Sequence, residues 1–325
     1  MTSPNPDWDD IATTTLESRR KELADNVTKN NALLLQLSKK DKIDPVSGGE
    51  VILEELEFDG NGTYKRYDGY EILNITPSRV FTAASFTWKQ AAVAVSISGK
   101  EMLQNSGEER MINLLTKRIG NAERTMRNGI SQDIYSDGTA DGAKQIGGLQ
   151  HLVPDDPTTG TVGGIDRATY TWWQTNKFSA TVDGSGAATA ANIQSYMNKL
   201  WVQCVRGADS PDLIVADNNY WTLYLESLQN IQRITDDEFA QAGFQTLKYM
   251  GAPVVLDGGF GGFAPTNHMY FLNCDYIYFR PHRDRNMVPM NPNRYSVNQD
   301  AMVKLIGFMG NMTISNGFVH GVLIN

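Results

Sequence analysis

The longest regular pattern of apolar and polar positions lies in residues 106–135. Ser106 and Glu109 have the spacing of a capping box at its start, and Ser136-Asp137-Gly138 supplies a stop. At 1.5 Å per residue such a helix would be about 45 Å long, roughly the width of a whole domain. The pattern predicts either a long helix across one side of a sheet or a plain long helix of an α+β enzyme. Its apolar residues recur at steps of three and four and form one stripe: Met111, Leu115, Ile119, Ala122, Met126, Ile130 and Ile134.

A weaker helical pattern occupies residues 8–40, and its leucines gather near the end, between residues 33 and 37. Residues 44–49 contain proline, serine and two glycines, which is typical of a linker. Nothing that follows directly in the sequence is able to complete a core with these leucines. We therefore expect residues 8–40 to form an arm that packs on the body of its own chain or on a neighbouring copy.

Residues 50–98 are rich in β-forming residues and end in a clear strand pattern at residues 93–97. The turn signal Asp59-Gly60-Asn61-Gly62 separates residues 50–58 from residues 63–70, which predicts a two-stranded ribbon. A lone ribbon is marginal in water, so it lies either at the edge of a local sheet or over another subunit. Its limbs carry acidic and then basic residues: Glu50, Glu54, Glu55 and Glu57, followed by Lys65 and Arg66.

Strands and helices alternate later in the chain, which predicts a small α/β unit over roughly residues 186–299. A helix is expected at residues 190–205, and a second helix, capped by Asn218, follows a buried strand. The tail at residues 301–325 has the pattern of a β-pair, so its final strand is expected to close a sheet that begins earlier. Strands are expected at residues 213–216, 248–256, 269–272 and 276–279.

A chain of 325 residues is long enough for two domains with their own cores, and its 41% hydrophobic content is ordinary for a globular protein. The formal net charge of −8 argues against a dedicated nucleic-acid-binding protein but permits a local basic patch. Cys204 and Cys274 have no metal-ligand spacing, so a reducing cytosol without disulfides is expected. The first residues do not resemble a signal peptide, and no run reaches the roughly 18–20 apolar residues of a membrane helix.

The sequence contains little that points to catalysis. Its four histidines are scattered and belong to no zinc motif, and nucleophile-elbow and Walker motifs are missing. Residues 259–264 match GxGxxA but lead into a predicted strand, which favours a plain loop over a dinucleotide site. We therefore predict no catalytic residue, no metal and no cofactor. A small basic cluster is predicted to be a solvated loop or a contact for nucleic acid or an acidic partner: Arg280, His282, Arg283 and Arg285.

A series of short stretches between residues 25 and 170 follows a consistent order. They are DNVTKNNALL at 25–34, GYEILNI at 69–75, WKQAAV at 88–93, ISG at 97–99, QNSG at 104–107, NAERTM at 121–126, YSDG at 135–138, GGL at 147–149 and GIDRAT at 164–169. Together they resemble major capsid proteins of tailed double-stranded DNA bacteriophages that have the HK97 fold. No single stretch is specific, and beyond residue 186 the resemblance concerns only the layout of elements.

The resemblance implies an α+β, HK97-like capsid fold with an N-arm, an extended E-loop, a P domain and an A domain. These parts would be residues 1–47, 48–90, 91–185 with 300–325, and 186–299. The helix at 106–135 would be the spine helix of the P domain. The implied product is an icosahedral shell that encloses the phage DNA, made in the host bacterial cytoplasm and located in the virion capsid. The predicted subunit contacts are Glu54, Glu57, Tyr64, Lys65, Arg66, Tyr67, Arg118, Arg124, Arg127, Arg283 and Arg285.

The implied partners are further copies of the chain in pentamers and hexamers, a portal, and packaged DNA through non-specific contacts. No scaffold-like extension precedes the arm, so a separate scaffolding protein is expected, and no membrane contact is expected. Some family members crosslink a ribbon lysine to an asparagine of a neighbouring P domain. Lys65 with Asn311 or Asn316 would be the candidates here, although no motif supports such a bond.

Three other interpretations remain open at this point. A cellular nanocompartment shell would share the fold but hold an enzyme cargo, and the long arm argues against it because such shells tend to lack one. A small-molecule α+β enzyme would need a convergent pocket of titratable groups, which the sequence does not indicate. A receptor-binding surface or tail protein would suit the glycine and aromatic content but not the long helix.

Overall fold

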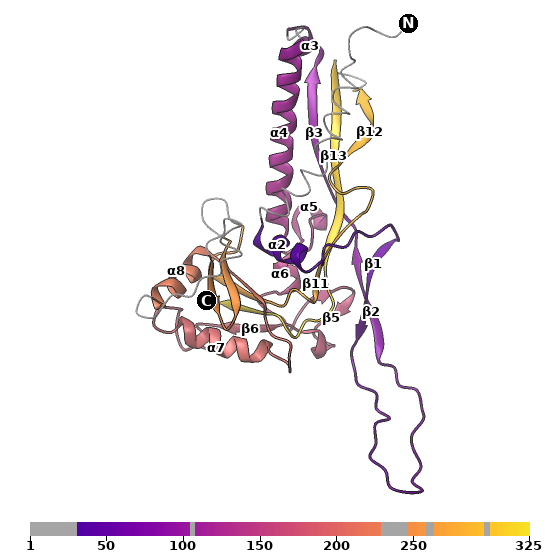
Figure 1. Cartoon of the computed structure of the whole chain (residues 1–325), viewed down its shortest axis with the longest axis vertical. Coiled ribbons are helices and arrows are strands. Elements are labelled where there is room, and N and C mark those ends of the chain that lie inside the picture. Colours follow the sequence, from indigo (N-terminus) through magenta and orange to yellow (C-terminus); the bar gives the residue numbers. More distant parts are fainter. Residues whose placement is uncertain (1–30, 105–107, 229–245, 258–262, 296–299) are drawn as a thin grey trace.

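The computed structural model describes residues 31–104, 108–228, 246–257, 263–295 and 300–325. Figure 1 shows three parts that follow one another along the longest axis of the molecule. A tall, narrow sheet with a long helix beside it occupies one end, an α/β body lies in the middle, and a ribbon with a long loop points away from both. The sequence-based prediction of mixed helices and sheets is confirmed.

The tall sheet is built around one long strand, β13 (Ala301–Ile314). Strand β3 (Lys89–Ser98) pairs antiparallel with the first part of β13 along one edge. Strands β12 (Val288–Tyr295) and β11 (Ile277–Pro281) pair antiparallel with successive parts of its other edge. Because β13 takes part in every pairing, it is the central strand that holds this sheet together.

Helix α4 (Glu108–Asp133) runs beside β3 over most of its length, after the short helix α3 (Gly99–Gln104). Its described inward face consists of Ile119, Ala122, Met126 and Ile130, and all four are buried, as the apolar stripe predicted. The expected capping box includes Ser106, which lies outside the described residues. Short helices α5 (Ala140–Ala143) and α6 (Leu149–Leu152) follow, and the amide of Leu149 donates to the carbonyl of Ile134 (2.7 Å), which fixes this return of the chain.

The α/β body contains a six-stranded sheet in the order β6-β14-β10-β7-β9-β8. Helices α7 (Ile193–Cys204) and α8 (Asn218–Ser227) cover one face. Along β7, Leu213 and Val215 enter one core while Ile214 and Ala216 enter the other, because alternate side chains of a strand point to opposite faces. The strands are β6 (Asn176–Ser179), β14 (Gly321–Ile324), β10 (His268–Leu272), β7 (Leu213–Ala216), β9 (Ala252–Leu256) and β8 (Thr246–Tyr249).

Three details of this region differ from the sequence-based expectations. The tail is not a β-pair, since β13 belongs to the tall sheet and β14 joins the body between β6 and β10. The expected α/β unit at residues 186–299 loses β11 and β12 to the tall sheet and gains β6 and β14. The cap of α8 is Asp217 and not Asn218, because the Asp217 carboxylate accepts from the amide of Tyr220 (2.9 Å).

The described part of the arm packs on its own chain. Helix α2 (Ala32–Lys39) is capped by Asn31, whose side-chain oxygen accepts from the amides of Leu33 (3.0 Å) and Leu34 (3.3 Å). Leu33, Leu34 and Leu37 are buried in the main core. The arm therefore docks on its own body from residue 31 onward, which was one of the two expected outcomes.

The ribbon pairs β1 (Val51–Glu57) with β2 (Phe81–Thr87), antiparallel and in register from Val51–Thr87 to Glu57–Phe81. The predicted second limb at residues 63–70 was wrong, because those residues belong to the loop between the two strands and form no strand. The hairpin β4 (Thr161–Val162) and β5 (Ile165–Asp166) packs on the ribbon, where the amide of Ser85 donates to the carbonyl of Gly163 (2.8 Å). A 3-10 turn, η1 (Thr171–Trp173), follows it.

Within the described ranges, no helix is both long enough and apolar enough to cross a membrane. Cys204 and Cys274 are free and buried, so neither takes part in a disulfide.

Candidate assembly surfaces

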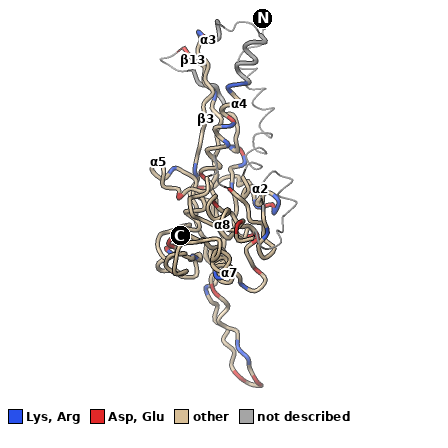
Figure 2. The backbone as a smooth tube through the Cα atoms, turned by 90° about the vertical axis from the view of Figure 1, so that its left-hand side faces the viewer, with Lys and Arg blue, Asp and Glu red and all other residues tan. Residues whose placement is uncertain are grey.

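The loop between β1 and β2 is the most exposed part of the described chain. It projects away from the body (Figure 1), and both basic and acidic residues lie along it (Figure 2). Tyr64 is 82% exposed and Tyr67 is 63% exposed, and Ile72 and Ile75 are almost fully exposed as well. Exposed apolar side chains gathered in one segment mark a surface that becomes covered by another molecule. The structure thus places the predicted contact residues of this loop on a projecting, uncovered surface.

The ion pair between Lys65 and Glu71 holds the tip of this loop, with Nζ 2.6 Å from Oε2. Gly69 has a φ of +53°, a left-handed conformation that glycine adopts without strain. The segment from Arg66 to Asp68 lies between the paired residues and is exposed. An exposed ion pair contributes little stability, so its effect here is mainly to limit the conformations of the tip.

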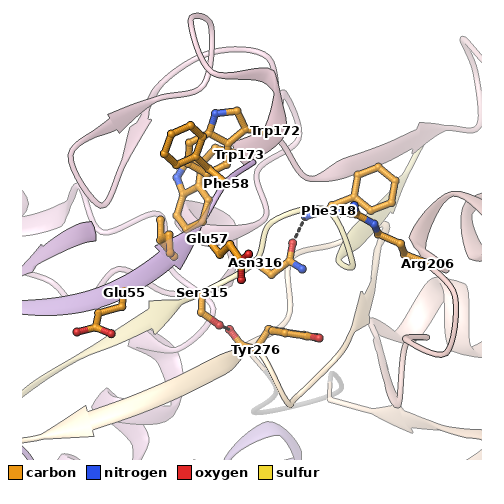
Figure 3. A pocket seen from close by; sticks show the side chains of 11 residues that line it. Glu55, Glu57, Phe58, Trp172, Trp173, Arg206, Tyr276, Ser315, Asn316 and Phe318 are labelled. Carbon is orange, nitrogen blue, oxygen red and sulfur yellow. Dashed lines mark hydrogen bonds between the residues drawn. The ribbon is translucent and has the colours of Figure 1, made fainter. Parts of the chain in front are cut away.

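A hollow of about 380 Å³ lies where the ribbon meets the body (Figure 3). Phe58 at the end of β1 stacks on Trp172 with ring centroids 5.5 Å apart, and these rings form one wall together with Trp173. Glu55 and Glu57 approach from the ribbon, whereas Arg206 lies at the opposite end near Phe318. The hollow therefore has an aromatic wall, an acidic end and a basic end.

A second hollow of about 430 Å³ lies on the ribbon side of the same aromatic wall. It is lined by Phe58 and Trp172 as well, and by Arg79, Phe81 and Tyr170. The side chain of Phe81 is largely exposed. The end of β1 and β2 from which the loop projects is therefore flanked by two aromatic hollows that share one wall.

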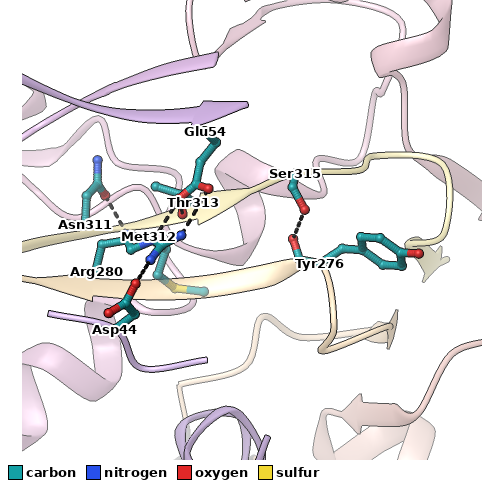
Figure 4. Close-up of polar contacts among 8 residues, drawn as sticks. All are labelled: Asp44, Glu54, Tyr276, Arg280, Asn311, Met312, Thr313 and Ser315. Atoms are coloured by element: carbon teal, nitrogen blue, oxygen red, sulfur yellow. Dashed lines mark hydrogen bonds and ion pairs between the residues drawn. The ribbon is translucent and has the colours of Figure 1, made fainter. Parts of the chain in front are cut away.

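Arg280 on β11 joins the ribbon, the arm and the tall sheet (Figure 4). Its Nε lies 2.8 Å from Oε1 of Glu54 and its Nη2 lies 3.1 Å from Oε2, while Nη1 forms an ion pair with Asp44. Thr313 on β13 also donates to the Glu54 carboxylate (2.8 Å). Burial alone would lower the pKa of Arg280, but hydrogen bonding and the charge of Glu54 raise it. The guanidinium therefore remains charged and links three separate segments.

Glu54 was predicted as a subunit contact, but its side chain does not lie on the surface. It is only 6% exposed, because it points from β1 toward the tall sheet. Glu57 follows on the same strand, three residues later, and is exposed at the hollow. Side chains alternate between the two faces of a strand, so residues an odd number of positions apart point to opposite faces. This is why Glu54 is buried and Glu57 is exposed.

The predicted basic contacts on the long helix have different environments. Arg118 is engaged inside the chain, where it pairs with Glu101 and donates to the carbonyl of Ser96. Hydrogen bonds from Ser98 and from Arg118 keep the pKa of Glu101 below its usual range. Arg124 is exposed and Arg127 is partly buried. Arg124 is thus the predicted helix contact that offers the most accessible charge.

The basic cluster near β11 is divided in the same way. Arg280 forms ion pairs with Glu54 and Asp44, whereas Arg283 and Arg285 are exposed on the turn that follows β11. Trp88 stacks edge-on against His282, with ring centroids 5.4 Å apart, and its indole NH donates to the carbonyl of Gly49 (2.9 Å). This turn therefore lies close to the base of the ribbon.

Asn311 and Asn316, the two candidates for a crosslink with Lys65, differ in accessibility. Asn311 is buried, accepts from the amide of Gly147 (3.1 Å) and donates to the carbonyl of Thr87 (2.9 Å). Asn316 lines the hollow beside Phe318 and is partly exposed. The side chain of Asn311 is thus occupied at the ribbon base, and Asn316 is the more accessible of the two.

Two titratable groups with shifted pKa values lie away from these surfaces. Burial raises the pKa of Asp257 at the end of β9 to about 6, and the hydroxyl of Tyr135 donates to its carboxylate. Burial lowers the pKa of His320 to about 3. Among the residues that the structure describes, no group of histidine, cysteine and carboxylate side chains is arranged to hold a metal ion. The glycine-rich segment at residues 259–264 lies largely outside the described ranges.

Sequence reasoning missed Arg280 as the link at the ribbon base and the stacked pair Phe58 and Trp172. Arg280 was assigned to a basic cluster because three cationic or histidine neighbours follow it within five positions. Its partners are more than two hundred positions away, so no local signal identifies them. The dense aromatic run at residues 170–173 was a usable sign, since aromatic residues in a polar loop usually cover another element.

No protein-family model matches the chain, and no curated protein matches it in sequence. Its structure is similar to a chain of the capsid asymmetric unit of Cyanophage A-1(L), with a TM-score of 0.61 and 16% identity over 87% of this chain and 90% of that one. A chain from Mycobacterium phage Bobi gives a TM-score of 0.54 and 9% identity over 90% of both chains. The encapsulin complex of Synechococcus elongatus gives 0.50 and 11% identity over 86% and 83%.

These identities are low, so the similarity concerns the fold. It extends over most of both chains in each comparison and includes a chain of a cyanophage capsid, a chain from a mycobacterium phage and a chain of an encapsulin complex. The order of parts is also the expected one, with an arm, a projecting ribbon, a long helix beside a tall sheet, and an α/β body. The chain therefore has the HK97-like fold of capsid shell proteins.

Proposed function

We propose that this chain is the major capsid protein of a tailed bacteriophage and that it assembles into an icosahedral shell around double-stranded DNA. The observation that carries the proposal is the fold similarity to a cyanophage capsid chain over 87% of this chain and 90% of that one. The projecting loop supports it, because its exposed apolar side chains need a second molecule to cover them. The role is structural, and self-assembly replaces catalysis as the activity of the protein.

The parts of the chain take the roles that the family resemblance implies. Residues 1–47 are the N-arm, residues 48–90 the E-loop, residues 91–185 with 300–325 the P domain, and residues 186–299 the A domain. The pairing of β14 and β6 with the body supports moving those two strands to the A domain, and the pairing of β11 and β12 supports moving them to the P domain. Pentamers and hexamers then form through heterologous contacts that close into rings.

A portal, a separate scaffolding protein and the packaged DNA complete the proposed set of partners. The chain carries a net charge of −8, so its contacts with DNA are limited to local basic surfaces. Arg124, Arg283 and Arg285 are accessible cations that suit either DNA or an acidic neighbour. Synthesis in the bacterial cytoplasm and location in the virion follow from this role.

Negative-stain electron microscopy of the purified protein tests the proposal. We expect closed shells, tubes, or rings of five or six copies, with regular shells of one size requiring co-expression of the scaffolding protein. A chain that stays monomeric at all concentrations and ionic strengths would contradict the assembly role. Abundant regular shells from this chain alone would contradict the need for a scaffold while leaving the shell role intact.

A nanocompartment shell is the second candidate function, because the encapsulin complex of Synechococcus elongatus shares the fold at a TM-score of 0.50. The two functions differ in what the particle contains. Particles purified from their native source contain nuclease-protected double-stranded DNA if the chain is a phage capsid protein. A stoichiometric enzyme without nucleic acid would favour the nanocompartment.

A further inference from the structure

The hollow beside the last residues of β1 has two ends of opposite charge. Glu55 and Glu57 approach it from β1, and both are exposed. Arg206 approaches from the other end, with its guanidinium carbon 6.0 Å from the centre of the Phe318 ring (Figure 3). A segment that fits this hollow therefore needs a cation at one end and an anion at the other.

Between these ends the wall is aromatic. Trp172 and Trp173 lie with ring centroids 5.7 Å apart, and Phe58 stacks on Trp172. Tyr276 closes the opposite side, where its hydroxyl donates to Asp209 (2.9 Å). The volume of about 380 Å³ falls within the range of pockets that accept a ligand or a large side chain. An aromatic residue is thus suited to the middle of the hollow.

The loop tip of the same chain presents a matching order of residues. Arg66, Tyr67 and Asp68 follow one another, so a cation and an anion flank an aromatic side chain. All three are exposed, and the ion pair of Lys65 with Glu71 brackets them. In an extended segment Arg66 and Asp68 point to one side and are about 7 Å apart, while Tyr67 points to the other.

We propose that Arg66-Tyr67-Asp68 of one copy docks in this hollow of the next copy. Arg66 pairs with Glu55 and Glu57, Tyr67 packs on the wall of Trp172 and Phe58, and Asp68 pairs with Arg206. The tip does not occupy the hollow of its own chain, because Tyr67 is 63% exposed. Tip and hollow are different surfaces, so the contact is head-to-tail and propagates from copy to copy. This inference rests on the proposed assembly function and names the surface that receives the loop.

Charge reversal tests the pairing of Arg66 with Glu57. Arg66→Glu and Glu57→Arg are each expected to reduce the shell yield at least tenfold, because like charges then face each other in the contact. The double variant Arg66→Glu with Glu57→Arg is expected to recover most of the yield. Asp68→Arg with Arg206→Asp provides a second, independent pair. Sedimentation and electron microscopy measure the yield, and Lys144→Glu, an exposed reversal outside both surfaces, is expected to leave it unchanged.

Single variants that assemble as well as the parent would overturn the inference, and so would double variants that do no better than the singles. Circular dichroism of each variant separates loss of contact from loss of folding. A parent chain that forms no assemblies would instead contradict the proposed function. Failure of the proposed contact can therefore be distinguished from failure of the proposed assembly function.

Disulfide trapping tests the same contact by proximity. Arg66→Cys with Glu57→Cys is expected to give a ladder of linked chains on a non-reducing gel after mild oxidation of assembled particles. Cys204 and Cys274 are buried, so the background is low. Arg66→Cys with Glu226→Cys, on α8 at the far side of the body, is the matched control and is expected to stay monomeric. A monomer band for both pairs would overturn the inference.

Discussion

Arg280 and Glu54 form a two-point contact in which Nε and Nη2 of the guanidinium lie 2.8 Å and 3.1 Å from the two carboxylate oxygens. The contact links β11 of the tall sheet with β1 of the ribbon, at positions separated by 226 residues. Two parallel hydrogen bonds fix an angle as well as a distance. The direction in which the ribbon projects is therefore set by this pair, and Asp44 extends the link to the arm.

Glu54→Gln is expected to destabilise the unassembled chain by about 1.5–3 kcal/mol, because the Arg280 guanidinium keeps its ion pair with Asp44 but loses the charged two-point contact with Glu54. Urea unfolding at low protein concentration measures this loss. Glu50→Gln removes an equal charge from an exposed position beside the ribbon, and a change within about 0.5 kcal/mol is expected. Equal stabilities of the two variants would show that the pair does not hold the ribbon.

Met126→Asp is expected to block assembly by separating α4 from the tall sheet. Met126 is 3% exposed in the centre of the apolar stripe, so the substitution buries a carboxylate without a partner. Particle yield and the thermal midpoint both report the effect. Asn128→Asp adds the same charge at an exposed position of the same helix and is expected to fold normally. A normal particle yield from Met126→Asp would show that this stripe does not anchor the helix.

Gly148→Ala is expected to destabilise the chain by several kcal/mol, because an added methyl group would overlap the backbone oxygens of Asp133 and Ile134 at the end of α4. Gly129→Ala is the matched control, since the same methyl group on α4 meets no atom within 4 Å. Glycine is unfavourable inside a helix by about 1 kcal/mol relative to alanine, so this control is expected to stabilise. Denaturant unfolding measures the change in the free energy of unfolding for both variants. If the two changes had the same sign, the overlap of the Gly148 methyl group with the backbone would not be the cause.

Asp257→Asn is expected to stabilise the chain at neutral and alkaline pH. Burial raises the pKa of Asp257 from 3.8 to about 6, so the folded chain gains stability from the protonated carboxyl below pH 3.8 and loses it as the pH rises through 6. The loss amounts to about 3 kcal/mol above pH 6. The variant has no carboxyl to ionise and is therefore more stable than the parent at pH 8, with the difference vanishing below pH 4.

The difference between variant and parent isolates Asp257 from other titrating groups. His320 acts in the opposite direction, because its pKa is lowered to about 3 and stability is lost as the pH falls below the ordinary value of 6.5. This contribution is common to both proteins and cancels in the comparison. A difference in unfolding free energy that stays constant between pH 4 and pH 8 would show that Asp257 has an ordinary pKa.

The long helix and the leucine-rich arm were predictable because their signals are local. A helical stripe is read from residues three and four positions apart, and the buried residues Ile119, Met126 and Ile130 follow that spacing. The arm leucines similarly indicated a helix that docks elsewhere, and Leu33, Leu34 and Leu37 are buried on the body. Residues 69–75 and 164–169 indicated the family by resemblance although they form mostly loops.

The second limb of the ribbon was not predictable from its turn signal. The glycines after Asp59 do start a turn, but the partner of β1 begins at Phe81, beyond an irregular loop. Nothing near β1 specifies so distant a partner, and the pairing places Ile52 opposite Phe86 and Glu54 opposite Ala84 on the buried face. The cap of α8 was misplaced by one residue for a simpler reason, since Asp217 and Asn218 are both good caps and only the end of β7 decides between them.

The mixture of helices and strands, the long helix with its buried stripe, and the arm without a local core were all predictable from the amino-acid sequence. Each follows from the spacing of apolar and polar residues, or from the composition, over a short stretch of the chain, because contacts between near neighbours in the sequence decide these features. Three features became known only from the folded chain: the strand that completes the ribbon, the sheet that receives the C-terminal strand, and the burial of Glu54 beside Arg280 while Glu57 stays exposed. These features depend on contacts between residues that are far apart in the chain. Several strands have a local pattern that would allow pairing, and the burial of one face selects the partner and the register.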